Sequence, residues 1–174
     1  MRTSELLHDT PKVTIAAING PCAGAGLAWA CACDLRYASA NAVFNTAFLA
    51  AAMPGDFGGT WTLPRIVGNA KARELDLLAE RFDADEALRI GLVSAVLSHD
   101  ELLPRVRQVG EGIAGFAPLA LRRVKENLND AERLSLHEHL EAEAGRHAFC
   151  CATRDAREAA EPFVHKRAPA FLGH

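Results

Sequence analysis

The chain has 174 residues, of which 49% are hydrophobic and 24% charged, and its formal net charge at pH 7 is −3. This length predicts one domain with a substantial core, and the apolar content argues against global disorder. The slightly acidic balance shows no footprint for nucleic acid. We therefore expect no nucleic-acid partner. Because no apolar run reaches the roughly 18 residues of a membrane span, we expect no membrane partner either.

Five cysteines occur in the sequence, an odd number at irregular spacings without a second pair of ligands. That pattern argues against structural zinc, and Cys31 and Cys33, set among alanines, are expected to pack as small apolar groups. Free cysteines, together with the absence of a signal-peptide pattern, predict a cytoplasmic protein.

The first hundred residues alternate between patterns typical of strands and of helices. Residues 1–10 resemble a short helix, and the apolar run 13–18 predicts a strand covered on both faces, as in a parallel sheet. An Asn-Gly-Pro break precedes an alanine-rich segment, 27–33, that predicts a buried helix. Further strands are expected at 34–38 and 42–45.

A glycine-rich loop over 54–59 precedes two expected helices, 61–67 and 71–78. Asp83, followed by Glu86 three residues later, predicts the N-cap of another helix, in an Asp-led variant of the capping box. That helix is expected to end at Gly91, before a short strand at 92–97.

Helical periodicity dominates the rest, with one helix opened by Pro118 and another over 134–150. We therefore predict an α/β core over residues 1–100 and a helical region over 101–174. The second of these helices carries His139, Glu143 and His147 at i, i+4 spacing. The HExxH pattern is absent, so we interpret them as a polar face or a subunit contact and predict no metal site.

The densest signal is the turn at 19–26, Asn-Gly-Pro-Cys-Ala-Gly-Ala-Gly. Gly24 and Gly26 allow backbone angles that other residues resist, and small side chains let a ligand approach the main chain. The following helix directs its first N–H groups and its positive dipole end at that ligand, which suits an anion or an enolate oxygen. The alternative is a glycine-rich turn that serves only close packing.

A dinucleotide-binding fingerprint is a competing interpretation of the same residues. Trp29 stands where the third glycine of that motif belongs, and no acidic residue ends a second strand at the required distance. Because the phosphate-binding motif GxxxxGK[ST] is also absent from the sequence, nucleotide binding is disfavoured.

Five ordered segments resemble the enoyl-CoA hydratase/isomerase (crotonase) family, in one register from about Lys12 to the C-terminus. They are Ile-Asn-Gly-Pro-Cys-Ala-Gly-Ala-Gly at 18–26 with Cys-Asp-Leu-Arg at 33–36; Ala-Phe at 47–48 with the Gly-Asp-Phe-Gly-Gly run at 55–68; Asp-Ala-Asp-Glu-Ala at 83–87 with Gly-Leu-Val at 91–93; the stretch 153–158; and the stretch 163–167. The resemblance implies a crotonase-type spiral core followed by a helical region that assembles a homotrimer or hexamer.

The resemblance further implies an acyl-CoA thioester as substrate, its enolate held by two backbone N–H groups, with coenzyme A part of the substrate and no separate cofactor. By position one N–H is that of Ala25, flanked by Gly24 and Gly26, and Cys22 is expected beside the same ligand. The other N–H belongs to an earlier segment of the family fold. We therefore expect a spiral core that lacks its N-terminal part.

Hydratases of the family use two glutamates, and the matching positions hold Ala28 and Phe48, neither of which can move a proton. Asp56 matches the aspartate of isomerase-like members, and the phenylacetate-pathway isomerases are the most similar members. The acid is set among apolar or small residues such as Met53 and Phe57, where desolvation would make it a better base. Alternatively, Asp56 caps a helix or fixes the loop.

We therefore predict double-bond isomerisation, with Asp56 removing a proton and one carboxylate able to return it at another carbon. Hydration by a non-standard route and a non-catalytic CoA-binding or assembly role are the alternatives. The resemblance also implies that Phe163 and Lys166 contact the adenine and 3′-phosphate of CoA held by a neighbouring subunit. An exposed helix end is the alternative for these two residues.

Overall fold

The computed structural model describes the backbone of residues 2–165 and 169–174, and the side chains of 2–159 and 169–174. The chain forms two compact units, Met1–Val109 and Gly110–His174. No helix within the described residues has the length and apolarity that a bilayer crossing requires.

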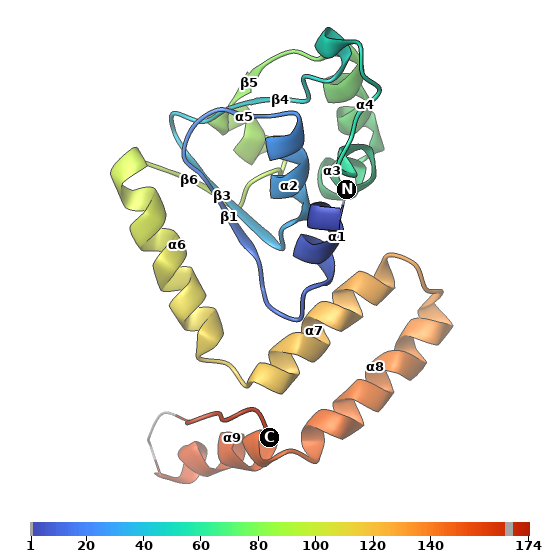
Figure 1. Cartoon of the computed structure of the whole chain (residues 1–174). Coiled ribbons are helices and arrows are strands. Elements are labelled where there is room, and N and C mark those ends of the chain that lie inside the picture. The colour runs from blue at the N-terminus through green and yellow to red at the C-terminus, as the bar shows by residue number, and fades with distance from the viewer. Residues whose placement is uncertain (1, 166–168) are drawn as a thin grey trace. The chain divides into compact units, whose positions relative to one another are not determined.

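The first unit alternates short strands with helices, as predicted (Figure 1). Its elements are α1 (Arg2–Asp9), β1 (Ile15–Ile18), β2 (Cys22–Ala23), α2 (Ala25–Ala32), β3 (Leu35–Ser39), β4 (Val43–Asn45), a 3-10 turn η1 (Leu49–Ala51), α3 (Gly59–Val67), α4 (Asn69–Leu78), β5 (Phe82–Asp83), α5 (Ala84–Arg89) and β6 (Ala95–Leu97). The helical region follows with α6 (His99–Ala114), α7 (Pro118–Ala131), α8 (Leu136–Cys151) and α9 (Arg154–His165).

The strands form two small sheets. In the first, the order is β1-β3-β6 and all neighbours are parallel, with Ala17 opposite Tyr37 and Ala38 opposite Val96. In the second, the order is β2-β4-β5, with β2 parallel and β5 antiparallel to β4. The expected parallel sheet is thus confirmed, although β1 forms its edge.

Two sequence expectations are corrected. The apolar run of β1 was expected to be covered on both faces, but residues 15–17 are only half-buried because the strand lies at an edge of its sheet. The expected strand at 92–97 begins only at Ala95, because the N–H groups of Leu92 and Val93 donate to the carbonyl of Ala87 and close the end of α5.

Helix α2 is central to the first unit. It has no polar face, and five of its eight residues are buried. Its close approach to α3 depends on small side chains, since a Cβ added at Gly59 would lie 3.4 Å from the Cβ of Ala28. The buried alanine-rich helix predicted from the sequence is therefore confirmed, and its small residues bring α2 and α3 together.

Helix α5 begins as predicted, with Asp83 as its N-cap. The Asp83 carboxylate accepts a hydrogen bond of 2.9 Å from the Glu86 N–H. The reciprocal half of the capping box is not formed among the described residues, because the Glu86 carboxylate binds Arg89 and Lys71 instead. These cations lower the pKa of Glu86 to about 2, the hydrogen bond from Arg89 being the largest cause.

We expect Asp83→Ala to lower the free energy of unfolding by about 1 kcal/mol, since a helix N–H loses its acceptor. Asp85→Ala is the matched control, an exposed acid in the first turn with no capping bond, expected to cost about 0.3 kcal/mol. Urea denaturation of both variants measures the difference, and equal losses would contradict a capping role.

Candidate active site

The glycine-rich turn joins β2 to α2 through Gly24, whose backbone has φ 51° and ψ −117°. Its N–H donates a hydrogen bond of 3.0 Å to the carbonyl of Asn45, at the end of β4, and its own carbonyl accepts one from Ala28. Gly24 has no side chain with which to cap α2, so the helix begins at Ala25 without a side-chain acceptor for its first N–H groups. The turn thus offers free main-chain donors at a positive helix end.

Four positions that the sequence singled out lie around one pocket: Gly24, Ala28, Phe48 and Asp56. The rest of its lining is mostly apolar or small, comprising Leu27, Cys31, Thr46, Gly55, Gly59, Thr60, Leu63 and Asp76. Its volume of about 20 Å³ suffices for roughly one water molecule.

Asp56 reaches this pocket from a loop of unusual backbone conformation. Phe57 and Gly58 both have positive φ, 54° and 77°, and the Asp56 carboxylate accepts a 2.7 Å hydrogen bond from the Phe57 N–H. The Phe57 ring packs edge-on against Trp29 of α2, with ring centroids 5.3 Å apart. This contact ties the loop to α2, the helix that follows the glycine-rich turn.

The apolar enclosure expected around Asp56 is wrong for this chain. Asp56 is exposed, and so are Met53 and the alanines before it, with Met53 at 49%. The loop lies at the surface of the unit, and Phe57 is turned toward Trp29, so these neighbours leave the carboxylate in contact with water.

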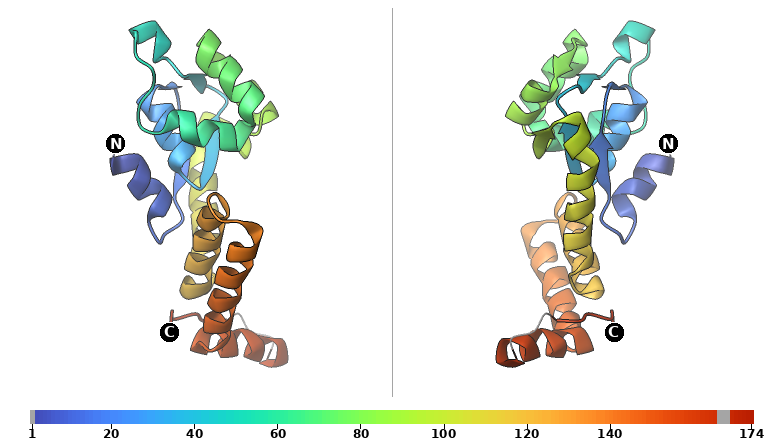
Figure 2. Two further views of the ribbon diagram at one scale, coloured as in Figure 1. Left: turned by 90° about the vertical axis from the view of Figure 1, so that its right-hand side faces the viewer. Right: turned by 90° about the vertical axis from the view of Figure 1, so that its left-hand side faces the viewer.

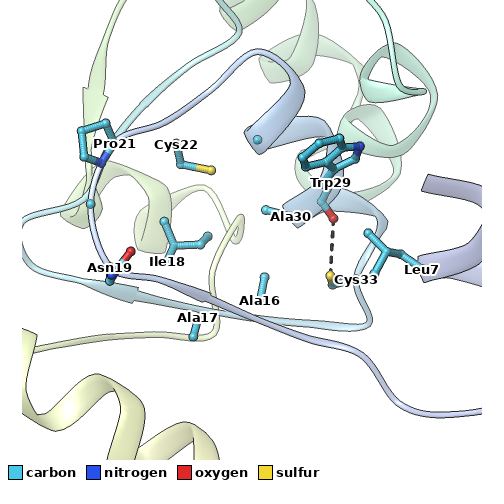
Figure 3. Close-up of a pocket in the computed structure, with 12 residues that line it drawn as sticks. Leu7, Ala16, Ala17, Ile18, Asn19, Pro21, Cys22, Trp29, Ala30 and Cys33 are labelled. Carbon is cyan, nitrogen blue, oxygen red and sulfur yellow. Dashed lines mark hydrogen bonds between the residues drawn. The ribbon is translucent and has the colours of Figure 1, made fainter. Parts of the chain in front are cut away.

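Cys22 and Gly26 line a different pocket from that of Gly24 and Asp56 (Figure 3). This second pocket has a volume of about 280 Å³ and is bounded by β1, the turn and α2, with Trp29 and Cys33 on its helical side. Ala25 lines neither pocket among the described residues. The turn expected to face one ligand therefore borders two cavities.

Cys22 and Cys31 are uncharged at neutral pH. Burial raises the pKa of Cys22 to about 11 and that of Cys31 to about 12. Cys33 is half-buried, and its Sγ lies 3.4 Å from the Trp29 carbonyl, to which it donates. Their interpretation as small apolar groups is confirmed for Cys31, which is buried in the core.

Asp76 of α4 is a lining residue that the sequence analysis did not consider. It is half-buried, and that burial raises the pKa of its carboxyl. Helical periodicity could have indicated its half-buried position. Asp76 comes one turn after the buried Ala72 and directly after the buried Leu75, at the border of the helix's apolar face.

The remaining predicted residues lie in the helical region. The side chain of Phe163 and the whole of Lys166 fall outside the described residues, so their contacts with CoA stay a prediction. Across residues 2–159 and 169–174, no three His, Cys, Asp or Glu side chains converge to hold a metal ion. On α8, His139 pairs with Glu143 at 4.0 Å.

The arrangement of strands and helices, together with the glycine-rich turn, places the chain among proteins of the crotonase fold. An enoyl-CoA hydratase from Bacillus anthracis superposes with a TM-score of 0.96 at 33% identity, covering 99% of this chain and 67% of that one. A probable enoyl-CoA hydratase/isomerase from Mycobacterium abscessus superposes with a TM-score of 0.93 at 32% identity, covering 99% of this chain and 66% of that one.

The family model described as enoyl-CoA hydratase/isomerase matches residues 2–174, and the chain belongs to that family. It is 36% identical to the crotonyl-CoA hydratase of Syntrophomonas wolfei over 96% of this chain and 64% of the relative. It is 34% identical to the 1,2-epoxyphenylacetyl-CoA isomerase of Escherichia coli, with the same coverage of 96% and 64%. The chain thus spans slightly under two thirds of the length of these curated relatives.

We expect Gly24→Ala to lower the free energy of unfolding by about 1–3 kcal/mol, because a side chain disfavours this positive-φ conformation. A Cβ there would meet its nearest atoms at 3.8 Å, so backbone strain rather than a clash is the cause. Gly26→Ala is the matched control, since its Cβ would enter open space within a helix and change stability by about 1 kcal/mol at most. Urea unfolding compares the two, and equal effects would contradict the strain.

Proposed function

We propose that the protein isomerises the double bond of an enoyl-CoA thioester through an enolate, with Asp56 as the base. The observation that carries the proposal is the shared pocket of Gly24 and Asp56, in which the acid positions of hydratases hold Ala28 and Phe48. Coenzyme A enters as part of the substrate, and no separate cofactor is needed for a proton shift.

The chemistry follows from the two sides of this site. Asp56 takes a proton from the carbon next to the thioester carbonyl, the C–H bond breaks, and its electron pair moves into the enolate. The Ala25 N–H, at the positive end of α2, stabilises the resulting oxyanion. A carboxyl group then protonates the carbon two bonds further along the chain, which moves the double bond.

The relatives' names include both reactions. Hydratases stand beside the epoxyphenylacetyl-CoA isomerase of Escherichia coli and the peroxisomal Δ(3,5)-Δ(2,4)-dienoyl-CoA isomerase of Arabidopsis thaliana, which is 39% identical over 95% of this chain and 60% of that relative. Ala28 and Phe48 favour the isomerases, because an alanine and a phenylalanine cannot activate water or protonate a carbon.

We expect Asp56→Asn to slow the conversion of 3-enoyl-CoA to 2-enoyl-CoA by about 100-fold or more, since an amide cannot accept the proton. The formation of the conjugated thioester is followed by its ultraviolet absorbance. Asp100→Asn, which alters an exposed acid of α6, is the matched control and should retain the wild-type rate.

Equal turnover by wild type and Asp56→Asn would eliminate Asp56 as the base. A parallel assay with crotonyl-CoA tests hydration, which is followed by the loss of crotonyl-CoA absorbance. Hydration that is faster than the isomerisation of 3-enoyl-CoA would favour the non-standard hydratase. Calorimetric binding of an acyl-CoA with neither reaction would indicate the non-catalytic role instead.

We also propose that the helical region assembles copies of the chain into a homotrimer or hexamer. Helices α7 and α8 lie side by side and run in opposite directions (Figure 2). They expose large apolar side chains, among them Leu128 at 65% and Leu136 at 74%. Apolar surface of this kind marks an interaction site.

We expect sedimentation velocity to show a trimer or hexamer for the wild type, and Leu128→Ser with Leu136→Ser to shift the mass toward the monomer. Loss of the apolar surface removes the driving force for association. Glu141→Ser, an exposed polar position on α8, is the control and should leave the mass unchanged. A monomeric wild type at micromolar concentration would refute the assembly.

A further inference from the structure

Asp76 faces the pocket of Gly24 and Asp56 from the side of α4, an element that the sequence analysis assigned no role. Asp56 enters the same pocket from the loop before α3. The two carboxyl groups therefore come from separate elements, and the rest of the pocket lining consists mostly of small or apolar residues.

The position of Asp76 is fixed by the end of β4. The Thr46 hydroxyl donates to the carbonyl of Leu75 at 3.1 Å, and the Asn45 amide donates to that of Ala79 at 2.7 Å. Both bonds hold the last turn of α4, which carries Asp76, against the strand end that also accepts the Gly24 N–H. Asp76 is thus held in fixed relation to the oxyanion turn.

Fold stability gives no reason for an acid at this position. Among the described residues, no hydrogen bond or ion pair reaches the Asp76 carboxyl, although it is half-buried. It also lies in the last turn of α4, where the negative end of the helix dipole disfavours a carboxylate. Ionisation of a half-buried carboxyl group without a partner is unfavourable, so an ionised Asp76 would lower the stability of the fold.

We propose that Asp76 is the proton donor of the isomerisation, a second catalytic carboxyl group that works with Asp56 across the shared pocket. This inference rests on the proposed function and deepens it. Asp56 as carboxylate takes the C2 proton, and Asp76 as carboxylic acid gives its proton to C4 of the enolate. Asp56 ends protonated and Asp76 ionised, and exchange with water restores both.

The environments of the two acids support this division of roles. Burial raises the pKa of Asp76, which favours its protonated form, whereas Asp56 is exposed to water and accepts a hydrogen bond from the Phe57 N–H. The other titratable group lining the pocket is the neutral Cys31 of α2. Helix α3, which packs against α4, contributes only uncharged residues to the lining.

The test is isomerisation of 3-enoyl-CoA in D₂O by the wild type, Asp76→Asn and the control Asp100→Asn. With two carboxyl groups, the product carries a solvent deuteron at C4, because Asp76 exchanges its proton with water before donating it. We expect Asp76→Asn to lose about 100-fold in turnover while it still exchanges the C2 proton through Asp56. Its residual product should retain more of the substrate's own proton, returned by Asp56.

Unchanged turnover and labelling in Asp76→Asn would overturn the role of Asp76 and leave the proposed function intact. A wild type that neither turns over 3-enoyl-CoA nor exchanges its C2 proton would overturn the proposed function, and the role of Asp76 with it. The two failures are therefore distinguishable.

A stability measurement separates catalysis from folding. Because the folded state disfavours the ionised carboxyl, Asp76 costs stability above its ordinary pKa of 3.8, and this cost grows as the pH rises through its raised value. Asp76→Asn should therefore have a higher urea midpoint than wild type at pH 7 and an equal one below pH 3.8. A lower midpoint at pH 7 would show a structural partner and overturn the proposal.

Discussion

The end of strand β4 is the point on which the site depends. Within two residues, the Asn45 carbonyl accepts the Gly24 N–H, the Asn45 amide binds the Ala79 carbonyl, and the Thr46 hydroxyl binds the Leu75 carbonyl. These bonds join the glycine turn to the last turn of α4. Gly24 of the turn and the carboxyl group of Asp76 are thereby placed on one pocket by the end of a three-residue strand.

Small side chains supply the second constraint. The approach of α2 to α3 leaves 3.4 Å between the Ala28 Cβ and a Cβ added at Gly59, so larger residues at this contact would separate the helices. The Phe48 ring lies next to the glycine-rich turn, with its Cζ 3.8 Å from the position that a Cβ at Gly24 would take. Ala28 and Phe48 both line the pocket, and neither side chain can titrate.

Local patterns were sufficient to predict the turn, α2 and the base candidate. Gly24 has the positive φ that its glycine predicted, and alanine spacing predicted a buried α2. The exposure of Asp56 could not be predicted, because it depends on the direction in which Phe57 packs. Likewise, the half-burial of β1 follows from its edge position, which periodicity within the strand does not reveal.

Asp76 escaped prediction for a related reason, since its role comes from tertiary contacts between α4 and β4 that lie about 30 residues apart in sequence. On a helix map it is a polar residue beside a buried stripe, the commonest place for a solvated acid. Only the shared lining with Asp56 separates these cases. An acid that lowers stability while it lines one pocket with Asp56 and Gly24 is best explained by chemistry, because folding alone would favour an uncharged residue there.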